Sequence, residues 1–219
     1  MISKDTLAFL KNLDANNNRD WFQANKQEFE KAKADLTDFT AFLIGEVSKF
    51  DPNISQVLPQ DCVFRIYRDV RFSKDKSPYK INLGSYLSPG GRKSMVPGYY
   101  FHLQPGQSFI AGGKHRPDSA ELLKIRRAIA NETDEFLKIL ADKTYQKHFG
   151  EMHGEKLVKA PKGFPADHKA VEYLKLKDFM AYRELFDDKF LTSKNFPSTL
   201  VEYLKEMYPL IKFLRKALS

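Results

Sequence analysis

The spacing of apolar residues changes twice along the chain, and this change restricts the fold more than any other sequence feature. Apolar side chains recur every three or four residues up to about residue 49, alternate with period two between residues 62 and 111, and return to helical spacing after Pro117. Amphipathic helices produce the first spacing and half-buried strands the second. The order predicts an α+β fold, with an antiparallel sheet of about four or more strands flanked by N-terminal and C-terminal helices.

The strand region contains four segments bounded by turn residues. Pro and Gly mark turns at residues 88–91 and 104–107, because Pro presets one turn position and Gly accepts the next. Strands joined by tight turns, with no helix between them, pair antiparallel. We expect these strands at residues 62–67, 81–87, 99–103 and 108–111. The length is typical of one domain, so residues 1–219 are predicted to form a single α+β domain.

The N-terminal part predicts three helices. Ser3 can cap the first, residues 19–22 form a short second one, and the third spans about residues 26–49. Trp21 and Phe22 form a large apolar pair in the second helix, so we expect Trp21 to be mostly buried and to join the N-terminal helices to the rest. Its replacement by Ala would then cost about 3–5 kcal/mol.

Composition narrows the class of protein. The net charge of +8 attracts polyanions, although many enzymes carry a similar charge. The single cysteine, Cys62, lies beside apolar neighbours and is expected to be a buried hydrophobe; a catalytic thiolate would need a positioned histidine. The sequence shows neither a signal peptide nor an apolar stretch of the roughly 20 residues that span a bilayer, which predicts a cytoplasmic protein without a membrane partner.

Charge is concentrated between Phe64 and Lys80, where six basic residues face two acidic ones and leave half of the net charge of the chain. Arginine matches carboxylate or phosphate with a planar fork of donors, lysine adds point charge, and tyrosine stacks on bases. The pattern predicts an anion-binding surface for a phosphate-containing small molecule or nucleic acid. Its residues are Arg65, Tyr67, Arg68, Asp69, Arg71, Lys74, Lys76, Tyr79 and Lys80.

Two other interpretations of this segment stay open. In the first, the protein is an enzyme in which Asp69 or Asp75 acts as base and the arginines clamp an anionic substrate. In the second, the protein is structural or an interaction partner, and the arginines form an internal ion-pair network. Two acids can neutralise only two of six bases, which favours an anion site. Arginines saturated by carboxylates and carbonyls would instead support the structural interpretation.

The sequence was also searched for the motifs of nucleotide, metal and hydrolase sites. The sequence lacks the GxxxxGK[ST] loop, a strand-linked GxGxxG, HExxH and GxSxG, so we expect no nucleotide cofactor and no metal. His148 and His153 are five residues apart, which misses the shared helical face that a metal pair needs. The run from Gly112 to Arg116 combines backbone donors with basic side chains, but paired glycines also commonly end strands.

Three stretches together are similar to one known family. They are Asn16-Asn17-Asn18-Arg19-Asp20-Trp21-Phe22, the segment Arg65 to Lys80, and Pro161-Lys162-Gly163-Phe164 with Asp167-His168. This pattern resembles the domain-of-unknown-function family 2461, a group of conserved hypothetical proteins found mainly in bacteria. The resemblance spans nearly the whole chain and implies a bacterial, cytosolic, one-domain protein. It implies no established activity and no assigned catalytic residues.

Overall fold

The computed structural model describes every residue except residue 153. The chain forms two compact units. Unit 1 comprises Met1–Ser94, Tyr100–Ile110 and Glu184–Val201, and unit 2 comprises Met95–Tyr99, Ala111–Arg183 and Glu202–Ser219. Within the described residues, none of the helices has both the length and the apolar character needed to span a membrane.

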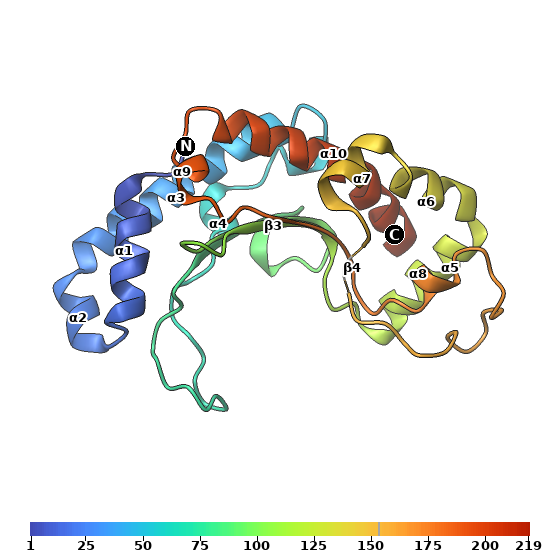
Figure 1. The fold of residues 1–219 in the computed structure, drawn as a ribbon, viewed down its shortest axis with the longest axis horizontal. Coiled ribbons are helices and arrows are strands. Elements are labelled where there is room, and N and C mark those ends of the chain that lie inside the picture. The colour runs from blue at the N-terminus through green and yellow to red at the C-terminus, as the bar shows by residue number, and fades with distance from the viewer. Residues whose placement is uncertain (153) are drawn as a thin grey trace. The chain divides into compact units, whose positions relative to one another are not determined.

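The strands form a four-stranded antiparallel sheet in the order β1-β2-β3-β4 (Figure 1). The predicted α+β class, with helices at both ends of the chain, is confirmed. Three of the expected strands are present with small shifts in their ends. The strands are β1 (Leu83–Leu87), β2 (Gly98–Leu103), β3 (Phe109–Lys114) and β4 (Phe179–Glu184).

The expected strand at residues 62–67 is wrong. A short helix, α4 (Pro59–Cys62), occupies its start, because Pro59 suits the first turn of a helix. The following residues make only isolated bridges, from Val63 to Ser85 and from Tyr67 to Tyr79. The sheet instead gains β4, which the sequence analysis missed because this strand follows a long irregular segment and has no turn signals around it.

Unit 1 contains the three predicted N-terminal helices, α1 (Lys4–Ala15), α2 (Arg19–Ala24) and α3 (Lys26–Val47). The Ser3 hydroxyl caps α1 by accepting from the Asp5 amide, and the Asn18 side chain caps α2. The remaining elements that lie wholly in unit 1 are η1 (Pro52–Ile54), α4, β1, η2 (Gly91–Lys93) and α9 (Asp188–Leu191). The Ser3 and Asn18 side chains each satisfy a backbone donor that the first turn of their helix leaves unpaired.

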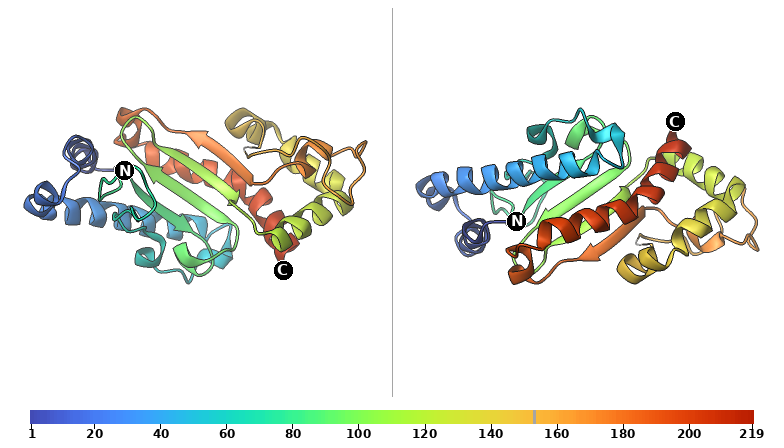
Figure 2. Two further views of the ribbon diagram at one scale, coloured as in Figure 1. Left: turned by 90° about the horizontal axis from the view of Figure 1, so that it is seen from below. Right: turned by 90° about the horizontal axis from the view of Figure 1, so that it is seen from above.

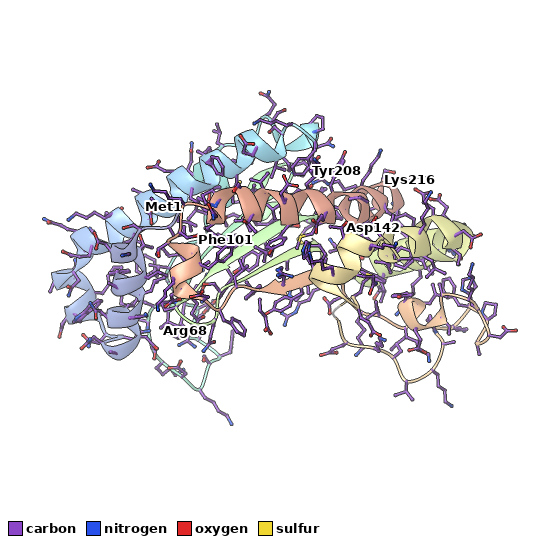
Figure 3. The ribbon with its side chains drawn as sticks, turned by 45° about the horizontal axis from the view of Figure 1, so that its top comes forward. Met1, Arg68, Phe101, Asp142, Tyr208 and Lys216 are labelled. Atoms are coloured by element: carbon purple, nitrogen blue, oxygen red, sulfur yellow. The ribbon has the colours of Figure 1, made fainter. Side chains whose placement is uncertain are left out.

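One face of the sheet in unit 1 is packed against helices. Phe39 of α3 lies 5.6 Å, ring centre to ring centre, from Phe101 of β2, which Figure 3 labels. Phe196, where α10 (Phe196–Leu218) begins, stacks on Phe39 at 5.5 Å. These three buried aromatic rings fix α3 and the start of α10 over the same face of β2.

Trp21 is mostly but not fully buried, which agrees with the expectation for this residue. Its ring stacks on Phe9 at 6.0 Å and lines a hollow of about 370 Å³ on unit 1. The connecting role belongs to its neighbour Phe22, which is 2% exposed and stacks on Tyr79 at 3.9 Å. A tryptophan with one open side loses less burial on truncation, so the full core cost does not apply to it.

Unit 2 is built around helices α5 (Ser119–Asn131), α6 (Thr133–Leu140), α7 (Lys143–Phe149) and α8 (Val171–Leu174), together with most of α10. Phe136 of α6 packs against Phe213 of α10 at 5.2 Å. The buried Arg126 guanidinium donates to the Leu174 carbonyl at 2.7 Å and the Leu176 carbonyl at 3.1 Å. Because these bonds satisfy a buried cation, they tie α5 to the segment that carries α8.

A buried ion pair connects β3 to α5 within unit 2. Lys114 is 2% exposed, and its ammonium donates to Glu121 Oε1 at 2.6 Å and to the Met95 carbonyl at 2.5 Å. The second oxygen of Glu121 accepts from the Asp118 amide in the capping box of α5. Glu121 therefore compensates a buried charge and begins a helix at the same time.

We predict that Glu121→Gln destabilises the protein by about 3 kcal/mol, because it leaves the Lys114 ammonium buried without a counter-charge. Glutamine keeps one oxygen for the capping box but turns an NH2 donor toward the ammonium, so the loss covers both the ion pair and its hydrogen bond. Denaturant unfolding measures the loss. Glu132→Gln, which breaks the exposed 2.8 Å pair with Lys216, is the control and should cost less than about 1 kcal/mol. Equal losses would show that Lys114 does not depend on this carboxylate.

Candidate anion-binding surface

Residues 65–80, here called the basic loop, leave α4 and return to β1. Three backbone bonds close the base of the loop antiparallel: Phe64 N to Gly84 O at 2.9 Å, Lys80 N to Ile66 O at 2.8 Å, and Arg68 N to Pro78 O at 3.0 Å. Beyond this base the chain extends away from the strands of unit 1 (Figure 1). The basic loop is thus ordered at its base and open to solvent at its tip.

Asn17 fixes the returning side of the basic loop. Its side-chain amide donates to the Tyr79 carbonyl at 2.9 Å and accepts from the Tyr79 amide at 3.1 Å. The Tyr79 ring stacks on Phe22 and is only 6% exposed. Tyr79 was expected to contact the ligand, but it is buried and anchors the loop instead. We call the contacts among Asn17, Phe22 and Tyr79 the Asn17 clamp.

Both acids of the basic loop pair with arginines. Arg68, labelled in Figure 3, binds Asp75 and also donates to the Ser77 carbonyl at 3.2 Å. Arg71 forms a two-bond pair with Asp69, at 2.9 and 2.7 Å. The structural interpretation therefore holds for these two arginines, and Arg68 in particular holds the two sides of the loop together.

The pKa values of both carboxyls lie below their ordinary range. Hydrogen bonds from Ser77, and then from Arg68, lower the pKa of Asp75, and hydrogen bonds from Arg71 lower the pKa of Asp69. A carboxylate stabilised in this way is a weak proton acceptor. The arrangement disfavours the enzyme interpretation in which Asp69 or Asp75 acts as general base.

The remaining cations are not neutralised. Lys76 donates to the Val70 carbonyl at 3.0 Å and Lys80 to the Arg65 carbonyl at 3.0 Å, contacts that leave their charges in place. The exposed side chains of Arg65 and Lys74 make neither a hydrogen bond nor an ion pair with any residue that the structure describes. The basic loop thus presents a surplus of four positive charges.

Two aromatic rings of the loop face solvent. Tyr67 is 53% exposed, while its ring also contacts Tyr79 at 5.5 Å. Phe72 is 95% exposed at the loop tip, beside the Arg71 guanidinium. The sequence analysis did not include Phe72, because an isolated phenylalanine between charged residues gives no periodic signal. Exposed aromatic rings beside cations can stack on the bases of a nucleic acid.

A second group that sequence reasoning missed lies on the sheet of unit 1. Tyr100 and His102 of β2 and Phe109 of β3 are half-buried. The Tyr100 hydroxyl is 3.0 Å from His102 Nδ1, and the His102 ring stacks on Phe109 at 4.5 Å. The signal was present in the alternation of β2, where Phe101 and Leu103 are buried and the residues between them point to the other face.

The run from Gly112 to Arg116 is structural. A Cβ on Gly112 would lie 2.6 Å from Met207, so this glycine allows close packing. Lys114 is buried in its ion pair, and the Arg116 amide donates to Asp178 Oδ1 at 2.6 Å. These backbone and side-chain donors are already used, so the run offers no anion site.

The remaining candidates for metal or nucleophilic chemistry are engaged or buried. His148 Nδ1 pairs with Glu206 Oε2 at 2.5 Å, and His153 lies outside the described residues. Among the residues described, no group of three or more His, Cys, Asp or Glu side chains is arranged to hold a metal ion. Cys62 is buried, and burial raises the pKa of its thiol to about 11, so it is not a thiolate at neutral pH.

The fold and the basic loop define an α+β protein in which two of the three distinctive sequence stretches, residues 16–22 and 65–80, meet at the Asn17 clamp. The chain belongs to the family described as conserved hypothetical protein (DUF2461), whose model matches residues 5–213. This match confirms the resemblance found in the sequence. Neither a curated protein nor a solved structure matches the chain.

We predict that Asn17→Ala lowers the free energy of unfolding by about 1–3 kcal/mol, because it leaves the half-buried Tyr79 amide and carbonyl unpaired. Hydrogen exchange should speed up at the amides of Arg68 and Lys80, which close the loop base. The control is Asn16→Ala, whose exposed side chain bonds only to the Asn12 carbonyl. Unchanged exchange in Asn17→Ala would mean that the clamp does not order the loop.

The lowered pKa values of Asp69 and Asp75 determine the pH at which the basic loop loses its ion pairs. Stability from a lowered carboxyl pKa is fully present above the unfolded value, near 3.9, and is lost as pH falls through the folded value. We therefore expect the Asp69 and Asp75 pairs to persist below pH ~4. Carboxyl carbon shifts in an NMR titration measure this. Titration of Asp69 and Asp75 at the value of an unfolded aspartate would contradict the pairing.

Proposed function

We propose that the protein binds a phosphate-bearing ligand through the basic loop. The observation that carries the proposal is the exposed surplus of positive charge that remains after both acids of the loop have paired. Arg65 and Lys74 are exposed and make no hydrogen bond or ion pair within the described chain. Like charges held close together destabilise a fold, and a bound anion relieves that repulsion.

The arrangement of the loop suits a ligand that bears several phosphates. Its cations follow an extended, solvent-facing segment, so they can contact successive phosphates along a chain. The pairs Arg68–Asp75 and Arg71–Asp69 support this surface by holding the loop in shape. The ligand class comprises phosphate-containing small molecules and nucleic acid, encountered in the cytoplasm, where the sequence predicts that the protein resides.

The structural interpretation explains part of the loop. It accounts for Arg68, which contacts Asp75 and a carbonyl, but not for the exposed Phe72 or for Lys74. A loop built only to stabilise the fold would gain from burying Phe72, since burial of an aromatic side chain contributes about 1.5–3 kcal/mol. The exposed phenylalanine favours contact with a ligand.

We expect the double variant Arg65→Gln/Lys74→Gln to bind long-chain inorganic polyphosphate at least about tenfold more weakly than the parent protein, because hydrogen bonds to charged groups contribute about 1.5–3 kcal/mol each. Its melting temperature should stay unchanged or rise, since neither side chain makes a hydrogen bond or ion pair within the described chain and the change relieves repulsion among the loop cations. Titration calorimetry measures binding. Arg68 and Arg71 are less suitable targets, because replacing them would leave Asp75 and Asp69 unpaired.

The matched control is Lys138→Gln/Lys147→Gln, which removes the same charge from exposed positions in unit 2. If the control weakens binding as much as the loop variant does, the interaction follows net charge and the loop is not the site. If the parent protein does not bind polyphosphate at all, the proposed function is wrong. A slope of log K against log salt that becomes shallower only in the loop variant supports the proposal.

A further inference from the structure

The sheet of unit 1 has two chemically different faces. Phe101 and Leu103 of β2 are buried against α3 and the start of α10. Tyr100 and His102 point to the opposite face, where they and Phe109 of β3 stay partly exposed. The left panel of Figure 2 views the sheet from this side, with the strands in front of α3. We call Tyr100, His102 and Phe109 the aromatic face.

The aromatic face is held rigid by its own contacts. The Tyr100 hydroxyl is 3.0 Å from His102 Nδ1, and His102 Nε2 is 3.1 Å from the Gln104 side-chain oxygen. The planes of His102 and Phe109 differ by only 14°. Gly84 of β1 makes room for the Tyr100 ring, because a Cβ there would lie 2.8 Å from the hydroxyl. Rings ordered in advance lose little conformational entropy when a ligand stacks on them.

The aromatic face adjoins the basic loop through Phe64, which precedes the loop. The Phe64 ring contacts Tyr100 edge to face at 6.0 Å, and the Lys80 ammonium lies 5.6 Å from the centre of the Phe64 ring. Lys80 in turn donates to the Arg65 carbonyl at 3.0 Å. Burial lowers the pKa of His102, and the nearby Lys80 charge adds to this against the opposing hydrogen bond with Gln104, so the neutral form of the ring is favoured. Cationic groups therefore lie at the edge of a neutral stacking surface.

We propose that the aromatic face stacks the bases of a single-stranded nucleic acid whose phosphates bind the basic loop; this inference rests on the proposed function. Stacking on aromatic side chains needs an exposed base face, which a single strand has and a duplex hides. The phosphate chain supplies the negative charge that complements the surplus of the loop. One ligand thus satisfies both the partly exposed rings and the unneutralised cations.

Other occupants fit less of the surface. An apolar peptide segment would cover the rings but would not complement the adjacent positive charge. A free phosphate compound without a ring would use the cations and leave the aromatic face without a role. A duplex presents its phosphates but encloses its base faces, so it would engage only the loop.

The first experiment compares ligands on the unaltered protein. A single-stranded oligonucleotide, an abasic phosphodiester chain of the same length and the corresponding duplex are titrated by fluorescence anisotropy at one salt concentration. We expect the single strand to bind at least about fivefold more tightly than the abasic chain, because stacking adds affinity for each base. Equal affinity for the abasic chain and the single strand would overturn the inference, and so would tighter binding of the duplex.

The second experiment tests the rings. Phe109→Leu keeps an apolar side chain on the strand and removes the flat surface, so it should weaken oligonucleotide binding by about fivefold and leave abasic binding unchanged. Phe42→Leu, at an exposed aromatic position on α3, is the control and should change neither. If Phe109→Leu lowers both affinities equally, the face has no base-specific role. If this variant unfolds, the ligand comparison on the unaltered protein decides.

The two proposals fail in distinguishable ways. Binding of polyphosphate and of the abasic chain, with no gain from the bases, leaves the proposed function standing and removes the inference. Absence of binding to polyphosphate, the abasic chain and the oligonucleotide removes both. Loss of polyphosphate binding in Arg65→Gln/Lys74→Gln, with an unchanged ratio between oligonucleotide and abasic affinities, shows that the loop and the aromatic face contribute separately.

Discussion

The Asn17 clamp is the contact on which the candidate site depends. Two hydrogen bonds from one amide side chain hold the backbone of Tyr79, and the ring of Tyr79 stacks on Phe22. Asn18 caps the helix that carries Phe22, so two consecutive asparagines start α2 and fasten a segment 62 positions away. Without this anchor, only the hydrogen bonds at the loop base and the two ion pairs would oppose the repulsion among the cations of the basic loop.

The ion pairs inside the basic loop explain how a strongly basic segment can be ordered. Arg68 and Arg71 pair with the two acids and hold the shape of the loop, and the charges of the remaining cations stay without a carboxylate partner among the described residues. Because two arginines are paired with acids and four basic residues are not, the same segment can be ordered and still attract anions. Desolvation costs little at such exposed positions, so the pairs contribute mainly geometry rather than free energy of unfolding.

Prediction from sequence succeeded where a periodic pattern was long. The stripe of α3, from Phe29 to Val47, and the alternation of β2 are both present in the structure. Prediction failed where tertiary contacts decide. Residues 62–67 alternate but leave the sheet, Tyr79 is buried by a partner far away in sequence, and the exposed Phe72 has no neighbours that form a pattern. The aromatic face could not be predicted, because the sequence does not indicate which side of the sheet the helices cover.

The bridge between Tyr67 and Tyr79 has a consequence for how this chain can vary. It brings the two ends of the basic loop together, so the residues between them close a loop whose ends are already fixed. Doubling the length of such a segment costs only about 0.6 kcal/mol in closure entropy. We therefore expect the fold to tolerate insertions and deletions between Tyr67 and Tyr79. The length and the charge of this segment can then change without a change in the core of unit 1.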